Sequence, residues 1–198
     1  MVQIASEAKA TVKHRPKLNT LGVRNVLPSD QRELDLVVSR LPIYGGKTVL
    51  GDATLRSPLT GSGDARPHAS SESGATFHGA RVDKASAHPE LHVPQCRFAF
   101  LVLASEIGGH CSSECHALIK QLANARANLH QESTRTTAKA MYTRRWYAIL
   151  SVGIQKAVAA NLSGVDNCSL DNVHSFVAFD ELFHACANLS EVSRLPMH

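Results

Sequence analysis

Apolar and polar residues alternate along several short stretches of the chain, and this pattern predicts a small β-sheet. Residues 17–28 and 33–42 each carry apolar and β-branched side chains and end at a proline, which is typical of short strands. Residues 47–56 predict a third strand with two unlike faces, because side chains in a strand alternate with period two. Asp52 lies in this strand. Since charged side chains are rarely buried unless they are paired or bind a metal, Asp52 is a candidate site residue.

The most apolar run, residues 96–109, predicts a fully buried central strand that carries Glu106 at its C-terminal end. Before it, a loop rich in Ser, Gly and Pro is expected over 57–76, followed by a helix over about 75–88. Apolar residues at helical spacing predict further helices over about 112–131 and 134–162, and the tail from Ser163 onward, which alternates small, polar and apolar residues, predicts a short helix near 179–189. The pattern therefore predicts an α/β (α+β) fold with a mixed four-stranded sheet, flanking helices and a C-terminal helical extension.

Length and composition are those of an ordinary globular protein. The chain has 198 residues, of which 43% are hydrophobic, and it has no apolar run long enough to span a membrane or to act as a signal peptide. The five cysteines are an odd number in a chain of this size, so reduced thiols are expected rather than a disulfide framework. We therefore expect an intracellular protein.

Basic residues gather in two segments, although the formal net charge is only +4. Residues 1–26 hold five Lys and Arg side chains against one acid, and residues 126–145 hold five against one. These segments either form one phosphate-binding face or are two ordinary solvated surfaces. The basic residues that we take as candidate nucleic-acid ligands are Lys13, Arg15, Lys17, Arg56, Arg81, Arg144 and Arg145.

Acidic residues mark three of the predicted strands, with one lysine on the helix between them. The set consists of Asp35, Asp52, Glu106 and Lys84. A phosphodiester nuclease needs carboxylates to hold divalent metal and a cation near the scissile phosphate, and Mg²⁺ prefers carboxylate oxygens. Each residue also has an ordinary interpretation: Asp35 in a turn, Lys84 on a solvated helix face, and Glu106 as a helix cap.

Two other kinds of chemistry have weaker support. Cys111 and Cys115 are four residues apart, but the chain has no second tight cysteine pair, so the spacing argues against a zinc module. The loop over 57–76 lacks the Gly-Lys-Ser/Thr ending of a phosphate-binding loop, and its serines have no nucleophile-elbow context. Nucleotide hydrolysis and serine-hydrolase chemistry are therefore not predicted.

Three strings, "RLPIYGGKTVLGDATLRSPLT", "GARVDKASAHPEL" and "LASEIGGHCSSE", resemble a segment found downstream of the reverse transcriptase in non-LTR retrotransposon proteins. That segment is a restriction-endonuclease-like domain of the PD-(D/E)xK superfamily, and the resemblance covers roughly residues 25–162. In the superfamily pattern an acid opens the second strand and another lies on the third, as Asp35 and Asp52 do here. In the superfamily pattern a lysine follows two residues after the second acid, but this position here is Thr54. In the resembled subfamily the lysine is thought to come from the next helix, where Lys84 stands.

The chain also departs from the family pattern at two other positions. His88 stands where a tyrosine is usual, and Cys111 stands where a tryptophan is usual, whereas Glu106 matches the family's Glu-x-x-Gly. The resemblance implies a basic N-terminal segment over 1–16, a restriction-endonuclease-like core over 17–131 and a helical extension over 132–198. We expect a fragment or decayed copy of a longer protein that carries the reverse transcriptase, located in the nucleus if the source is eukaryotic.

The leading hypothesis is a DNA endonuclease domain dependent on Mg²⁺ or Mn²⁺, with Asp35 and Asp52 as metal ligands and Glu106 sharing the site. The alternatives are a catalytically inactive nucleic-acid-binding remnant and a helical interaction protein. Whether Asp35, Asp52 and Lys84 converge in space discriminates between the first two. At the site, clustered carboxylates repel, so Asp52→Asn is expected to be neutral or slightly stabilising in the free protein.

Overall fold

The computed structural model describes residues 1–60, 62–72, 74–93 and 96–163. Met1–Val158 form one compact unit that contains the whole sheet. The helices are α1 (Val2–Glu7), α2 (Ala75–Ala87), α3 (Ser113–Ala127) and α4 (Arg135–Ser163), and short 3₁₀ helices are η1 (Leu18–Leu21), η2 (Tyr44–Gly46), η3 (Pro89–Leu91) and η4 (Glu132–Thr134). The strands are β1 (Thr11–His14), β2 (Leu36–Ser39), β3 (Thr48–Arg56) and β4 (Phe98–Glu106).

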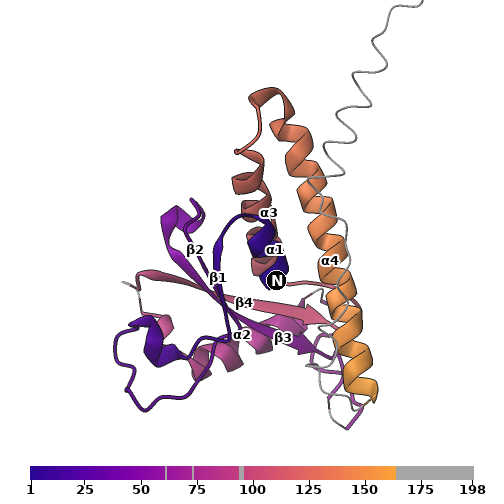
Figure 1. The fold of residues 1–198 in the computed structure, drawn as a ribbon. Helices are drawn as coiled ribbons and strands as arrows, with labels where there is room; N and C mark the ends of the chain where they lie inside the picture. The colour runs from indigo at the N-terminus through magenta and orange to yellow at the C-terminus, as the bar shows by residue number, and fades with distance from the viewer. Residues whose placement is uncertain (61, 73, 94–95, 164–198) are drawn as a thin grey trace, which may run out of the picture. The chain divides into compact units, whose positions relative to one another are not determined.

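The strands form one mixed sheet in the order β1-β2-β3-β4 (Figure 1). β1 and β3 both run antiparallel to β2, and β4 runs parallel to β3. The parallel step needs a crossover connection, which α2 supplies between β3 and β4. The predicted mixed four-stranded sheet with flanking helices is therefore confirmed, and the helix expected over about 75–88 is α2.

The strand predicted over 17–28 is wrong. This stretch instead forms η1 and an irregular loop, and the first strand of the sheet, β1, lies upstream at Thr11–His14. Gly22 and Asn25 both have positive φ, at 64° and 63°, which interrupts an extended strand. Two of the apolar side chains that suggested a strand, Leu18 and Val23, are still buried, because the loop itself packs onto the sheet. β1 lies in the predicted N-terminal segment 1–16 and pairs with β2 of the predicted core.

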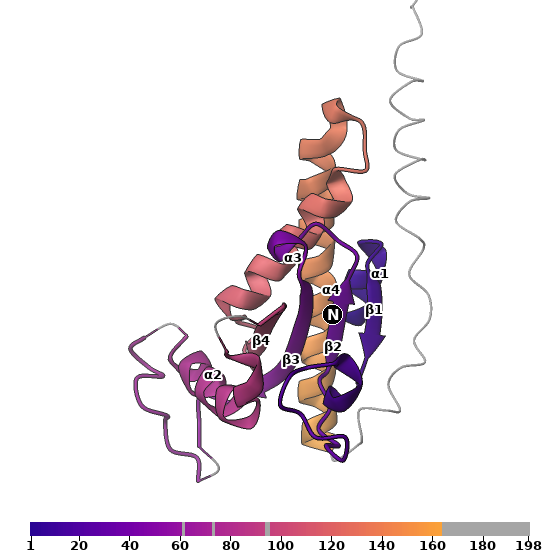
Figure 2. The same cartoon turned by 90° about the vertical axis from the view of Figure 1, so that its left-hand side faces the viewer.

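The position of β4 is also different from the one expected, because β4 is an edge strand and not a central one. Its continuous apolar sequence is explained by cover on both faces. On one face, Phe77 and Ala80 of α2 pack with Val102 and Ala104, and on the other, Leu103 lines a cavity together with residues of α4. Figure 2 shows α2 and α4 on opposite sides of the sheet. Burial on two faces therefore does not require a strand on both edges.

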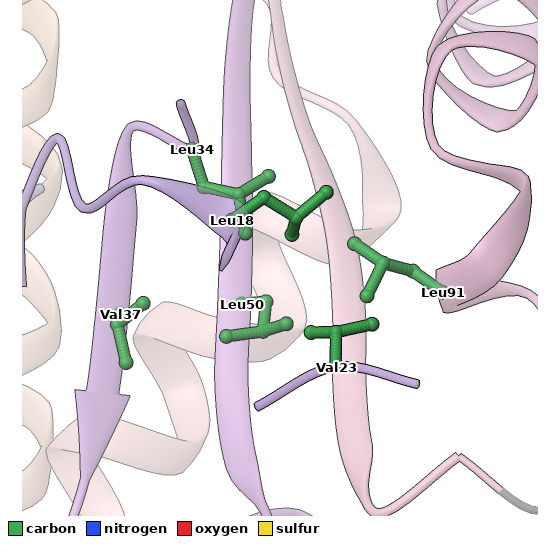
Figure 3. Packing of buried hydrophobic residues seen from close by; sticks show 6 residues of the cluster. All are labelled: Leu18, Val23, Leu34, Val37, Leu50 and Leu91. Carbon is green, nitrogen blue, oxygen red and sulfur yellow. The ribbon is translucent and has the colours of Figure 1, made fainter. Parts of the chain in front are cut away.

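One apolar cluster packs on the face of the sheet that also carries Asp52. Its buried members are Leu18, Val23, Leu34, Val37, Leu50 and Leu91, which come from the loop, β2, β3 and η3 (Figure 3). Leu50 is two residues before Asp52 and therefore shares its face. Burying one such side chain contributes about 1.5–3 kcal/mol. The cluster fixes the backbone next to the acidic residue.

The two helices predicted over about 112–131 and 134–162 are present as α3 and α4. Leu118, Ile119 and Leu122 of α3 are fully buried, as is Trp146 of α4. The short helix expected near 179–189 lies outside the described residues. In the part of the chain that the structure describes, no helix is long and apolar enough to cross a membrane.

Candidate active site

Asp35 and Asp52 are brought together by the pairing of β2 with β3. The antiparallel register sets Leu36 opposite Gly51, so the residue before β2 lies beside the residue after Gly51. Asp35 Oδ2 accepts a 2.7 Å hydrogen bond from the backbone N–H of Ala53. The carboxyl groups of Asp35 and Asp52 are close enough that each shifts the pKa of the other. The first half of the predicted convergence is therefore present in the geometry.

Lys84 of α2 and His88, the residue that directly follows this helix, complete the cluster. Lys84 Nζ donates to Asp52 Oδ1 at 2.7 Å, and His88 Nε2 lies 3.2 Å from Asp52 Oδ2. Phe77 and Ala80 pack on the sheet, and Lys84 follows them at helical spacing, so the buried face of α2 also directs the lysine to Asp52. Asp52 is only 5% exposed, which makes this a buried charged pair with a histidine beside it.

The two carboxyl groups have opposite pKa shifts. Burial raises the pKa of Asp52, but hydrogen bonds from His88 and Lys84 outweigh burial, so the pKa lies below its usual value. Burial is also the largest influence on Asp35 and raises its pKa; the Ala53 N–H opposes this, but the Asp52 carboxylate adds to it. Asp35 therefore takes up a proton more readily than Asp52. Such divergence between adjacent acids is typical of functional sites.

Asp35→Asn is expected to raise the free energy of unfolding at neutral pH. A carboxyl group whose pKa is raised on folding stabilises the protein below its unfolded pKa, 3.8 for Asp35, and this contribution is lost as pH rises through the folded pKa. Asparagine keeps an acceptor for the Ala53 N–H and removes the repulsion. Denaturant unfolding at about pH 7 and about pH 4 measures the difference, which should shrink in acid. Asp64→Asn, an exposed loop variant, is the control, and a destabilised Asp35→Asn protein at neutral pH would contradict the prediction.

His88 was absent from the residues predicted to form the site. It is buried, and its ring packs edge-on against Phe100 with centroids 5.8 Å apart. Its second nitrogen, Nδ1, lies 3.8 Å from Glu90 Oε1, and Glu90 in turn lies 3.1 Å from Arg32 Nη2. The sequence signals for it were its position four residues after Lys84 and its place where the resembled family usually has a tyrosine. His88 thus lies between Asp52 and the ion pair of the buried Glu90 with the partly exposed Arg32.

Glu106 does not join the acidic pair, which corrects the expectation that it shares the metal site. Asp52 is level with Val102 in the parallel register, and Glu106 lies four residues farther along β4. At about 3.3 Å per residue this is a separation of about 13 Å along the strand. Glu106 accepts a short hydrogen bond from Thr76 Oγ1 and lies 3.5 Å from His110 Nδ1. It does not cap α3 either, since the N-cap is Ser112.

Most of the basic residues predicted to bind nucleic acid are engaged by neighbouring side chains. The pairs are Arg15 with Glu33, Lys17 with Gln31, Arg56 with Asp83, Arg81 with Glu114, and Arg145 with Glu7. Lys13 and Arg144 are exposed and form no ion pair within the described ranges. A phosphate-binding role for the whole set stays a prediction, and the two exposed side chains are the most accessible for it.

The donor set at the acidic pair fits magnesium better than zinc. Among the described residues, no group of three or more His, Cys, Asp and Glu side chains is arranged to hold a metal ion. Mg²⁺ usually binds through one or two carboxylates and keeps several waters, which Asp35 and Asp52 can satisfy. Lys84 and His88 contact the two oxygens of Asp52, so a cation that binds there must displace at least one of them.

Comparisons with known proteins add no assignment to this geometry. No protein-family model matches the chain, and no curated protein matches it significantly. The cluster of Asp35, Asp52, Lys84 and His88 therefore has to be interpreted from its own geometry and chemistry.

Proposed function

We propose that this protein is a divalent-metal-dependent DNA endonuclease domain of the restriction-endonuclease-like kind that nicks target DNA in non-LTR retrotransposon proteins. The observation that carries the proposal is the hydrogen bond of Lys84 to the buried carboxylate of Asp52, beside which the register of β2 and β3 places Asp35. The strand order also supports it: one acid directly precedes the second strand, the other lies within the third, and the lysine comes from the following helix.

Each residue of the cluster has a distinct role in this proposal. Asp35 and Asp52 would hold the Mg²⁺ or Mn²⁺ ion, which supplies an activated water and stabilises charge on the leaving oxygen. Lys84 is 25% exposed, so its ammonium group can leave Asp52 and contact a phosphate at the surface. His88 is buried and orients the second oxygen of Asp52. Glu106 has no part in this set.

Nicking of supercoiled plasmid tests the proposal directly. The full chain, freed of divalent metal, should nick plasmid after addition of Mg²⁺ or Mn²⁺ and should stop when EDTA is added, because Asp35 and Asp52 need a cation to direct water at a phosphate. Circular dichroism before and after EDTA shows whether the fold survives metal removal. A folded protein that leaves the plasmid intact at every metal concentration would refute the endonuclease proposal.

One observation favours the alternative of a nucleic-acid-binding protein without cleavage activity. Both oxygens of Asp52 already have partners in Lys84 and His88, so the cluster is internally satisfied without metal. In this case the protein should bind duplex DNA without nicking it, and its affinity should fall as salt rises, because lysine and arginine contacts to phosphates release counterions. Binding isotherms at several salt concentrations separate this alternative from a protein that does not bind DNA.

A further inference from the structure

A pocket of about 460 Å³ lies between the loop that follows η1 and the start of β4. Its volume is within the range of small-molecule sites. The acidic pair of the candidate active site is not part of its lining. The lining combines one carboxylate, two guanidinium groups and apolar side chains, which belong to Glu90, Arg24, Arg97, Val23 and Phe98. This combination favours a ligand that has N–H groups at one end and an anion at the other.

The carboxylate of Glu90 is buried at the wall of this pocket. Its side chain is only 7% exposed, and Arg32 Nη2 lies 3.1 Å from its Oε1 atom. His88 Nδ1 lies 3.8 Å from the same oxygen, which is too far for a hydrogen bond. An ionised carboxylate offers about four acceptor positions, so these contacts leave most of them unused. Buried acceptors are normally satisfied, and N–H groups of a ligand in the pocket would satisfy this one.

Two arginines lie at the pocket without a carboxylate partner in the described part of the chain. Arg97 Nη2 donates to the backbone oxygens of Leu21 and Gly22 at 3.1 and 3.0 Å, which fixes its guanidinium at the pocket wall. Gly22 makes room for this contact, because its φ is 64° and a Cβ atom there would lie only 2.8 Å from Arg97 Nη2. Arg24 is exposed and lines the same pocket. Guanidinium N–H groups that are free of carboxylates are suited to a phosphate.

We infer that this pocket binds a guanine nucleotide, with the base at Glu90 and the phosphate at Arg24 and Arg97. Guanine places two N–H donors, N1–H and the 2-amino group, side by side, so they donate together to one carboxylate. Adenine and cytosine place a ring-nitrogen acceptor beside their amino group, and a carboxylate repels this acceptor. The flat ring packs against Val23 and Phe98, which line the pocket.

The pocket volume of about 460 Å³ is large enough for one nucleotide. That nucleotide comes either as free guanosine monophosphate or as an unpaired guanosine of a nucleic-acid strand, and both present the same base edge and phosphate. The inference does not depend on the proposed nuclease function, because it concerns a separate pocket and is tested without metal or cleavage.

Calorimetric titration of the full chain in EDTA tests the base contact. The natural chain should bind guanosine monophosphate at least about tenfold more tightly than adenosine or cytidine monophosphate, which is the discrimination typical of a paired polar contact to a base. Glu90→Gln should abolish this preference, because the carboxylate charge is lost and an amide N–H group then competes with the guanine donors. Glu33→Gln is the control, since Glu33 also pairs with an arginine, Arg15 at 3.0 Å, but does not line the pocket.

Thermal melting of each variant verifies folding, and Glu90→Asp, which draws the oxygens back by one methylene, provides a second variant if glutamine is not tolerated. Two results would overturn the inference. One is the absence of binding by the folded natural chain at millimolar guanosine monophosphate, and the other is equal affinity for guanosine and adenosine monophosphate.

The phosphate contact is measured with a second variant. Arg24→Ala should weaken the binding of guanosine monophosphate about tenfold, because it removes a donor to a charged group, and should leave the binding of guanosine, which has no phosphate, unchanged. Arg144→Ala, which removes an exposed arginine of α4, is the control. Equal weakening of both ligands by Arg24→Ala would contradict the placement of the phosphate.

Competition identifies the source of the nucleotide. A short single-stranded DNA with one guanosine among thymidines should displace guanosine monophosphate if the pocket takes a base from a strand, and the same strand with adenosine in place of guanosine should not. Displacement by neither strand assigns the pocket to the free nucleotide. Equal displacement by both strands would overturn the guanine assignment.

Discussion

Asp52→Asn is expected to lower metal-dependent plasmid nicking by at least about 10²-fold. Asparagine keeps the shape of the side chain but removes the charge that would hold a divalent cation next to Asp35. The contact with Lys84 also weakens, since the 2.7 Å hydrogen bond at Oδ1 loses its ionic character. Initial nicking rates at saturating Mg²⁺ measure the change. Equal rates for the natural chain and the Asn variant would show that Asp52 has no catalytic role.

The same variant is expected to lose stability, which revises the expectation from sequence that it is neutral or stabilising. Asp52 is buried, and although burial raises its pKa, its lowered pKa shows that His88, Lys84 and Asp35 stabilise its charge more than burial destabilises it. Removing that charge leaves a partly buried lysine without its ionic partner and should cost about 1–3 kcal/mol. The stabilisation by Asp52 is present above its unfolded pKa of 3.8 and is lost as pH falls through the lower folded value.

Asp64→Asn is the matched control for both effects. It removes the same charge from an exposed loop position that follows β3 and does not contact the acidic pair. We expect its nicking rate to be unchanged and its stability to shift by no more than about 0.5 kcal/mol. If the two Asn variants lost nicking equally, the decrease would reflect lost solubility or folding and would not support a role for Asp52.

The strand that carries Asp52 was predictable because its local signals agree. Alternation over 47–56 and the turn chemistry on both sides predict a strand, and β3 spans Thr48–Arg56. The segment 17–28 shows the opposite case. Leu18 and Val23 are buried as a strand would require, but positive φ at Gly22 and Asn25 makes the segment a packed loop. Apolar content predicts burial, whereas only backbone conformation distinguishes a strand from a loop that covers a core.

Which acids lie beside Asp52 depends on how the strands pair, and no local sequence pattern shows this pairing register. Asp35 lies next to Asp52 because β2 and β3 pair with Leu36 opposite Gly51. Glu106 is excluded because β4 is parallel to β3 with Val102 opposite Asp52, so Glu106 lies four residues farther along the strand. Asp35 and Glu106 each lie near one end of a predicted strand, so their local sequence context does not distinguish them. If β2 and β4 were shifted by a few residues against β3, Asp35 would move away from Asp52 and Glu106 could move toward it.

The pairing of charged side chains was the least predictable feature. Arg145 belongs to a basic segment and was a candidate phosphate ligand, but its guanidinium donates to both oxygens of Glu7, at 3.0 and 3.1 Å. The two residues are 138 positions apart, so no local pattern links them. Local charge density shows which segments are basic; it does not show which arginines already have a structural partner.

Trp146→Ala is expected to lower the free energy of unfolding by about 3–5 kcal/mol. The indole is completely buried, and its Nε1–H donates to Glu7 Oε2 at 2.8 Å, beside the contacts of Arg145 with the same carboxylate. Burial raises the pKa of Glu7, but the hydrogen bonds from Arg145 and Trp146 outweigh it and lower that pKa. Alanine therefore leaves a cavity and also weakens the attachment of α1 to α4. Denaturant unfolding with a fixed m-value measures the loss.

Two further variants separate the contributions at this position. Trp146→Phe keeps most of the apolar area and removes the donor to Glu7, so it should cost less than alanine, with about 1–3 kcal/mol due to the hydrogen bond to a charged acceptor. Val152→Ala, on the same helix at 47% exposure, should change stability by no more than about 0.5 kcal/mol. Equal losses for Trp146→Ala and Val152→Ala would mean that α4 is not held on the sheet through Trp146.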